Sequence, residues 1–203
     1  MLINEIIESN NKLALPVLSQ FAQLPSKNSV FPQSEIVAFV RSTSFLAHHS
    51  YPLPAVEIVD ERDYCFAAFR KIIYAMYSHQ PEAKAEASNA WQVFGEPVTQ
   101  QAMVALYEIV VDVRGHEAFK IVPSKNIVKV YPKEILNLVR QFMSLGGVLD
   151  FSQSYRTEEA TQFAFYLIGE LGNRSDLGRL RELSRLPKFS LEALSAIKSI
   201  EGK

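Results

Sequence analysis

Cysteine is nearly absent from the chain: Cys65 is the only one among 203 residues. A single cysteine excludes a disulfide within the chain and any zinc site that needs several cysteines. Cys65 lies in the apolar stretch YCFAAF, which favours a buried, unreactive thiol over a nucleophile. The low cysteine content fits a reducing compartment, and we therefore expect a cytoplasmic protein.

An excess of basic charge and long apolar runs are missing as well. The net charge is −1 at pH 7 and the pI is about 6.4, so no general basic excess attracts a phosphate backbone, and nucleic acid is a disfavoured partner. No stretch of about eighteen uninterrupted apolar residues occurs, so no membrane span is predicted. The opening segment MLINEIIESNNK lacks a basic start, and Asn and Glu interrupt its apolar positions, unlike a secretory signal.

Familiar catalytic motifs are also lacking. The sequence contains no His-Glu-x-x-His pair, no nucleophile elbow and no phosphate-binding glycine loop. The acidic pairs Asp60-Glu61 and Glu158-Glu159 begin predicted helices, where the helix dipole accounts for them. His48 and His49 are adjacent, and in an extended segment their rings would point to opposite sides, which disfavours a shared metal ion. We therefore predict no catalytic residue, no metal site and no cofactor.

Apolar residues do recur at helical spacing along most of the chain, and 48% of the residues are hydrophobic. This pattern predicts a mainly α-helical fold, large enough for one globular domain or two small ones. Asp60 with Asp63 resembles a capping box before a long helix that is apolar around much of its circumference, so we expect that helix to be central. The helices expected before residue 150 are Leu2–Glu8, Lys12–Leu24, Glu35–Ala47 with Ser34 as its cap, the long helix from Asp60 to Ser78, Glu82–Phe94, one beginning at Pro97, and Pro132–Leu145.

Two segments between these helices are open to two interpretations. Pro52 and Pro54 indicate an extended connector: either a boundary between an N-terminal helical cap (residues 1–50) and a main domain (residues 51–203), or an ordered crossing loop in one compact unit. Further on, Ala118–Val122 and Ile127–Tyr131 flank a polar Pro-Ser-Lys-Asn link, which is typical of a β-hairpin inserted near residues 118–131. The alternative there is an irregular loop followed by a helix.

The most strongly specified stretch runs from Thr157 to Ile200 and predicts three short helices with tight turns. Thr157 is expected to cap the first helix, and Gly172 to end it in a left-handed conformation. Asp176 and Ser190 are expected to cap the second and third. Three short helices cannot each bury an apolar face alone, so they are expected to stack. The predicted core positions are Phe163, Leu167, Ile168 and Leu171, then Leu177, Leu180 and Leu183, and finally Leu191, Leu194, Ile197 and Ile200.

Two runs in this stretch, LIGELGNRSDLGRLREL and FSLEALSAIKSIEG, carry a resemblance to a known family. They resemble the short HEAT-like repeats of phycobilin-lyase-type proteins, in which a helix ending in Leu-Gly, an Asp-containing turn and a leucine-rich second helix precede the next unit. The resemblance covers residues 157–202, little more than one repeat. It implies a HEAT-like α-solenoid or stack of helical hairpins, in which the second helix of each unit lines a concave surface.

Arginines gather in the second helix of this stretch and in the turn before it. With the leucines inward, a rotation of about 100° per residue turns Arg181 and Arg185 away from the core, beside Glu182. The resemblance implies a groove here, so Arg174, Arg181, Glu182 and Arg185 are candidate binding residues for an acidic protein surface or a phosphate-bearing ligand. An ordinary solvated face with charge pairs is the alternative.

Trp91 is a further binding candidate, because polar residues flank it. Large aromatic side chains more often belong to a core than to a ligand cage, so packing is the competing explanation.

A helical architecture without catalytic motifs favours a non-catalytic protein-binding module, an adaptor or an inhibitor (immunity-type) protein that uses a concave helical face. An enzyme is the alternative, because bilin lyases and alkylpurine DNA glycosylases are built on similar scaffolds. A glycosylase would need a basic groove and aromatic platforms, which the pI and the single tryptophan disfavour. A structural subunit or homodimer is the third possibility.

Overall fold

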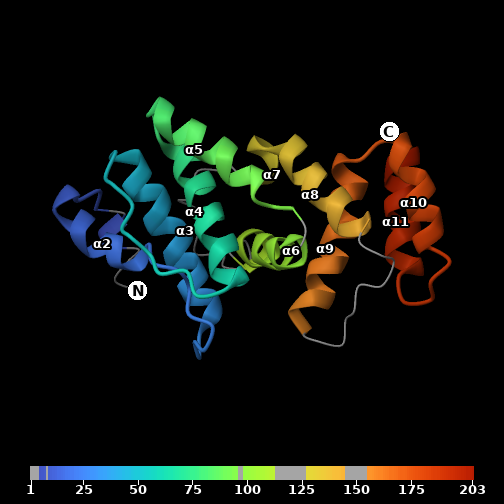
Figure 1. The fold of residues 1–203 in the computed structure, drawn as a ribbon, viewed down its shortest axis with the longest axis horizontal. Coiled ribbons are helices and arrows are strands. Elements are labelled where there is room, and N and C mark those ends of the chain that lie inside the picture. The colour runs from blue at the N-terminus through green and yellow to red at the C-terminus, as the bar shows by residue number, and fades with distance from the viewer. Residues whose placement is uncertain (1–4, 8, 96–97, 113–126, 145–154) are drawn as a thin grey trace. The chain divides into compact units, whose positions relative to one another are not determined.

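The computed structural model describes residues 5–7, 9–95, 98–112, 127–144 and 155–203 (Figure 1). Within these ranges every regular element is a helix, which confirms the mainly α-helical prediction. The chain divides into two compact units: unit 1 combines Met1–Phe94 with Glu108–Val130, and unit 2 combines Gly95–Tyr107 with Tyr131–Lys203. The division predicted near residue 50 is a different one and remains a prediction. Among the described helices, none has the length and apolar character to cross a membrane.

Unit 1 is organised around one long helix, α4 (Glu61–Tyr77), which packs against its neighbours on several sides. Asp60 caps it by accepting a hydrogen bond from the amide of Asp63 at 3.0 Å, as the sequence predicted. Phe66, Phe69 and Ile72 are fully buried, so the prediction of a central helix is confirmed. The other helices of unit 1 are η1 (Lys12–Ala14), α2 (Leu15–Phe21), α3 (Pro32–His48), α5 (Pro81–Gln92), the π-helix η2 (Glu108–Asp112) and α7 (Ile127–Val130).

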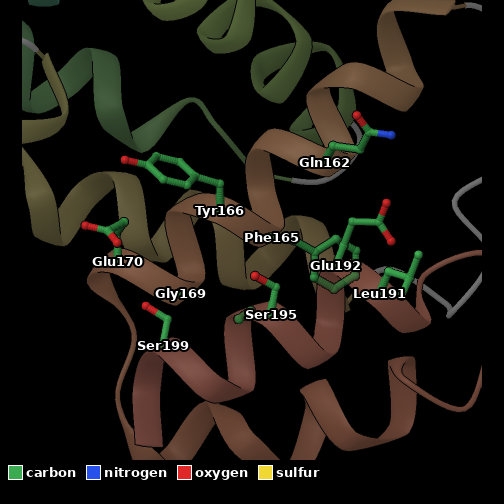
Figure 2. A pocket seen from close by; sticks show the side chains of 10 residues that line it. Gln162, Phe165, Tyr166, Gly169, Glu170, Leu191, Glu192, Ser195 and Ser199 are labelled. Atoms are coloured by element: carbon green, nitrogen blue, oxygen red, sulfur yellow. The ribbon is translucent and has the colours of Figure 1, made fainter. Parts of the chain in front are cut away.

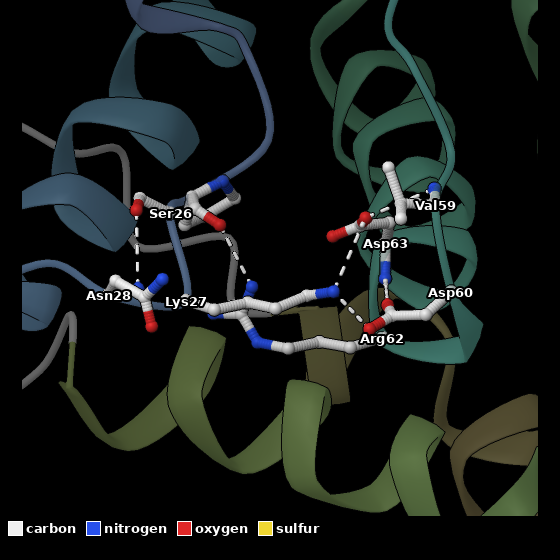
Figure 3. Close-up of polar contacts among 8 residues, drawn as sticks. Ser26, Lys27, Asn28, Val59, Asp60, Arg62 and Asp63 are labelled. Atoms are coloured by element: carbon white, nitrogen blue, oxygen red, sulfur yellow. Dashed lines mark hydrogen bonds and ion pairs between the residues drawn. The ribbon is translucent and has the colours of Figure 1, made fainter.

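Polar side chains in α4 and at its start bind the segments that connect the helices of unit 1. Figure 3 shows Lys27 between Asp60 and Asp63, with its amine 3.7 Å from a carboxylate oxygen of Asp63. Arg62 donates a hydrogen bond to the carbonyl of Pro25 at 2.8 Å. The connector with the two prolines forms no helix, and the carbonyl of Pro54 accepts a hydrogen bond from Arg70 of α4 at 2.9 Å. These contacts join the connecting segments to α4 within unit 1.

Unit 2 is built around α9 (Tyr155–Leu171), which packs against α6 (Thr99–Tyr107), α8 (Pro132–Ser144) and α11 (Ser190–Glu201). A short 3-10 helix η4 (Arg174–Asp176) leads into α10 (Leu177–Leu183), which packs on α11. Three helices therefore do follow one another between residues 155 and 201. The HEAT-like stacking implied by the resemblance remains a prediction.

The predicted β-hairpin is wrong in its second half. Ile127–Val130 form α7, which packs on α4 within unit 1, and its first residue, Ile127, is buried. A run of four β-branched and charged residues is too short for its pattern to distinguish a strand from a helical turn. Tertiary packing therefore determines the conformation of this segment. The other predicted strand, Ala118–Val122, lies outside the described residues.

Several predicted helix ends are also corrected. Helix α9 begins at Tyr155, so Thr157 lies inside its first turn, where its carbonyl accepts a hydrogen bond from Thr161. Phe189 and Phe31, not Ser190 and Ser34, stand at the starts of α11 and α3, and neither helix has a side-chain cap. Pro32 at the start of α3 has no N–H that a cap would satisfy, and Phe189 before α11 is buried, with its ring centroid 5.8 Å from that of Phe165.

Candidate functional site

A hollow lies between α9 and α11 in unit 2 (Figure 2). We call it the α9–α11 groove; its volume is about 480 Å³. Side chains from two helices line it, one set from the face of α9 that meets α11 and one from the adjoining face of α11. The lining residues are Gln162, Phe165, Tyr166, Gly169, Glu170, Leu191, Glu192, Ser195, Ala196 and Ser199.

Small residues bring the two helices together and determine where the groove lies. A methyl group at Gly169 would lie 3.3 Å from the Cα of Ala196 and 3.4 Å from the Cβ of Ser199, so the backbones approach closely there. Nearer the start of α9, the rings of Phe165 and Phe189 have their centroids 5.8 Å apart. The earlier residue of α9, Phe165, meets Phe189 just before α11, and the later one, Gly169, approaches Ala196 and Ser199. Helices α9 and α11 therefore run in the same direction.

Large apolar side chains stand exposed on α9 and α11. Leu191 is 78% exposed, Leu194 is 54% exposed and Tyr166 is 56% exposed, whereas Phe165 at the bottom of the groove is buried. The predicted core face of α11 is thus wrong at Leu191 and Leu194. Gly169 of α9 admits only a small residue opposite it, so the buried face of α11 is formed by Ala193, Ala196, Ile197 and Ile200.

The charges at the groove are acidic. Figure 2 shows Glu170 and Glu192 towards opposite ends of the hollow, with the hydroxyls of Ser195 and Ser199 between them. The described residues that line it include these two carboxylates and no basic side chain. A smaller hollow of about 30 Å³ shares Gln162, Phe165 and Glu192 with the groove and adds one residue of each sign, Glu158 and Lys188.

The predicted arginine site lies on a different part of unit 2. Arg174, Arg181, Glu182 and Arg185 are all exposed on η4, α10 and the turn after it. An Nη of Arg181 lies 3.1 Å from Glu201, and Glu182 accepts a hydrogen bond from Arg179 at 3.0 Å. Both pairs are largely exposed, and such pairs contribute little to stability.

Trp91 belongs to unit 1 and is half-buried in an aromatic cluster. Its ring meets Phe69 edge-on at 5.9 Å and Phe94 at 5.6 Å, and Phe69 and Phe94 stack on each other at 4.6 Å. The structure therefore does not bring Trp91 into one unit with the arginines, and its ring contacts are those of a core residue.

Cys65 is fully buried in α4. Burial, with the nearby charges of Glu61 and Asp60, raises the pKa of the Cys65 thiol to about 12. Since the thiolate is the reactive form, this thiol is unreactive near neutral pH, as the sequence predicted.

Three histidines of unit 1 lie closer together than the sequence indicated. His48 ends α3 and His49 follows it, so the segment is helical rather than extended, and their ring centroids are 5.1 Å apart. The ring of His79 lies 6.5 Å from that of His48. Across the part of the chain that the structure describes, no group of three or more histidine, cysteine, aspartate or glutamate side chains is arranged to hold a metal ion.

The groove residues Tyr166, Glu170 and Glu192 were not predicted from the sequence. The available signal was the spacing of Ala193, Ala196, Ile197 and Ile200, which follows one helical face as well as the leucines do. Comparison with known proteins supplies no further guide, since the chain matches no protein-family model, no curated protein and no solved structure.

Proposed function

We propose that the protein is a non-catalytic protein-binding module, of the adaptor or inhibitor kind, and that the α9–α11 groove is its binding surface. The observation that carries the proposal is the exposure of Leu191 and Tyr166, which line a hollow of about 480 Å³. Exposed large apolar side chains at a depression are typical of interaction sites.

The free energy of burying apolar side chains favours the binding of a partner at this surface. Burying apolar surface contributes roughly 25 cal/mol per Å², so covering a leucine side chain contributes about 2 kcal/mol. Aromatic residues with a polar tip, such as Tyr166, are enriched at interfaces because one end is apolar and the other can hydrogen-bond. Helical repeats of the kind that residues 157–202 resemble also bind partners along broad helical surfaces. The resemblance favoured α10, but we assign the surface to α9 and α11 because the exposed apolar side chains are there.

A site-specific cross-linking experiment tests the proposal. A photo-reactive amino acid replaces Leu191 in one variant and Leu13, which is 87% exposed in unit 1, in a matched control. Both variants are expressed and irradiated in the organism of origin. We expect a discrete protein adduct from position 191 and none of the same mass from position 13. Equal adducts from both positions, or none from either, would contradict the proposal.

A binding titration then distinguishes a specific interface from non-specific cross-linking. The cross-linked partner is purified and titrated with the wild-type protein and with the variants Leu191→Glu, Tyr166→Ala and Leu13→Glu. Loss of one central apolar contact at an interface costs about 2 kcal/mol or more, so the first two variants should bind at least tenfold more weakly. The control variant should bind like the wild type, and thermal unfolding verifies that all variants fold.

A further inference from the structure

We infer that the groove receives an amphipathic helix of another protein, with lysine or arginine beside its apolar stripe. The inference rests on the proposed function and names the chemistry of the partner. Three observations carry it: the shape of the groove, the sign of its charges and the engagement of the neighbouring basic residues.

The shape of the groove suits a helix. It runs from Gln162 to Glu170 along α9 and from Leu191 to Ser199 along α11, which corresponds to about 12 Å of helix at 1.5 Å per residue. An amphipathic helix that places residues i, i+3 or i+4, and i+7 on one face spans a similar length. Its apolar side chains would pack between Tyr166 and Leu191. The described part of unit 2 is helical and offers no sheet edge to an extended peptide.

The charges of the groove favour a basic partner. Glu170 and Glu192 stand near its two ends, without a basic side chain among the described lining residues. A lysine or arginine at each end of the bound helix would meet a carboxylate, and complementary charges of this kind set orientation and association rate. An acidic helix, a phosphate group or an anionic lipid surface would instead meet two like charges.

Four basic residues elsewhere in the described part of unit 2 have other contacts. Arg140 binds Asp176, Arg179 binds Glu182 and Arg181 binds Glu201. The amine of Lys203 comes nearest to the end of the groove, where it donates to the backbone carbonyls of Glu170 at 2.6 Å and Gly172 at 3.3 Å. In these contacts the basic side chains do not pair with the carboxylates of Glu170 or Glu192, so the lining of the groove stays acidic.

Two designed peptides test the inference. Both carry the same leucine stripe at positions i, i+4, i+7 and i+11; one has lysine at its polar positions and the other has glutamate. Fluorescence anisotropy measures the binding of each to the full-length protein at low and at high salt. We expect the lysine peptide to bind at least about tenfold more tightly than the glutamate peptide, with a preference that weakens at high salt. Equal binding, tighter binding of the glutamate peptide, or no binding of either would overturn the inference.

Charge-reversal variants test whether the preference for the lysine peptide arises at the groove. Glu170→Lys and Glu192→Lys should each weaken the binding of the lysine peptide, whereas Glu57→Lys, an exposed position in unit 1, makes the same charge change and should not. Glu192→Gln serves as a second variant in case the lysine disturbs the first turn of α11. If the peptide preference fails while the adduct at position 191 forms, the surface binds a protein of other chemistry; if both fail, the proposed function fails too. A dimer in light scattering that Leu191→Glu abolishes would overturn the inference by making a second copy the occupant.

Discussion

The guanidinium of Arg140 donates two hydrogen bonds to the carboxylate of Asp176, from Nε to Oδ1 at 2.8 Å and from Nη2 to Oδ2 at 2.9 Å. The same carboxylate accepts the amide of Asn173 at 2.9 Å and so completes a capping box at the start of η4. Burial alone would raise the pKa of Asp176, but the hydrogen bonds from Arg140 and Asn173, together with the charge of Arg140, lower it. One buried carboxylate thus joins α8 to the turn that begins α10.

Replacing this carboxylate should destabilise the protein more than breaking an exposed pair. Asp176→Ala removes the capping acceptor and leaves Arg140 without its partner, and we expect the free energy of unfolding to fall by about 2 kcal/mol. The expected loss is moderate because the side chain of Arg140 is 36% exposed, and water solvates part of its charge once Asp176 is gone. Glu201→Ala breaks the pair with Arg181, which is exposed on both sides, and should cost about 0.5 kcal/mol or less. Equal losses in chemical denaturation of the two variants would contradict this account.

Two glycines next to that turn should respond in opposite directions to alanine. A methyl group at Gly172 would lie 2.3 Å from the carbonyl oxygen of Ile168 and 2.9 Å from Oδ2 of Asp176, so Gly172→Ala forces the backbone or the carboxylate to move. We expect a loss of about 1 to 3 kcal/mol. Nothing lies within 4 Å of the corresponding position at Gly178 in α10, so Gly178→Ala should gain about 0.5 kcal/mol from helix propensity. Thermal unfolding of both variants measures the difference; a loss at Gly178 would show that the contrast is not steric.

Gly172 also illustrates how far the sequence could predict this fold. Leu-Gly followed by Asn correctly indicated the end of α9, because glycine is a common terminator. The predicted reason, a left-handed backbone, is wrong: Gly172 has no such positive φ, and close contacts with Ile168 and Asp176 are what exclude a side chain. Local patterns report where a helix ends, whereas the atoms that surround its end come from other parts of the chain.

The groove was harder to predict for a related reason. Two faces of α11 have helical spacing, one with leucines and one with alanines, and the face with the larger residues was predicted to be the core. Burial of the alanine face follows from Gly169 on α9, whose close approach leaves no room for a leucine. By contrast, α4 was predicted well, because it is apolar around most of its circumference and no choice of face had to be made.

A buried arginine should be important for the stability of unit 1. Arg70 is 5% exposed and donates to the carbonyls of Ala22 at 3.0 Å and Pro54 at 2.9 Å, so it ties α4 to two separate connecting segments. Arg70→Met would leave both acceptors without this donor, and we expect a loss of about 2 to 4 kcal/mol in urea unfolding. The neighbouring Lys71 is half-exposed and lies 3.8 Å from Glu86, so Lys71→Met should change stability by about 0.5 kcal/mol or less. Similar effects of the two substitutions would refute the assigned role.

The pH dependence of unit 1 should include a contribution from His49. Its ring contacts that of Phe45, with centroids 4.5 Å apart, and its Nε2 lies 3.0 Å from the side-chain oxygen of Asn10. Burial, followed by the positive charges of His48 and Lys12, lowers the pKa of His49 below its ordinary value of 6.5. The unfolded chain therefore binds a proton more readily than the folded one. Stability should fall as the pH drops below about 6.5, and this contribution should level off once the pH is below the folded pKa.

Two histidine variants check this sign. His49→Gln removes the titrating ring, so the fall in stability between neutral and mildly acidic pH should become shallower in chemical denaturation measured across that range. His48→Gln keeps His49 but removes a neighbouring positive charge, so the pKa of His49, followed by the NMR shifts of its ring protons, should rise towards its ordinary value. A pKa of His49 above that of a histidine in the unfolded chain would reverse the sign and contradict the prediction, because stability would then increase on acidification.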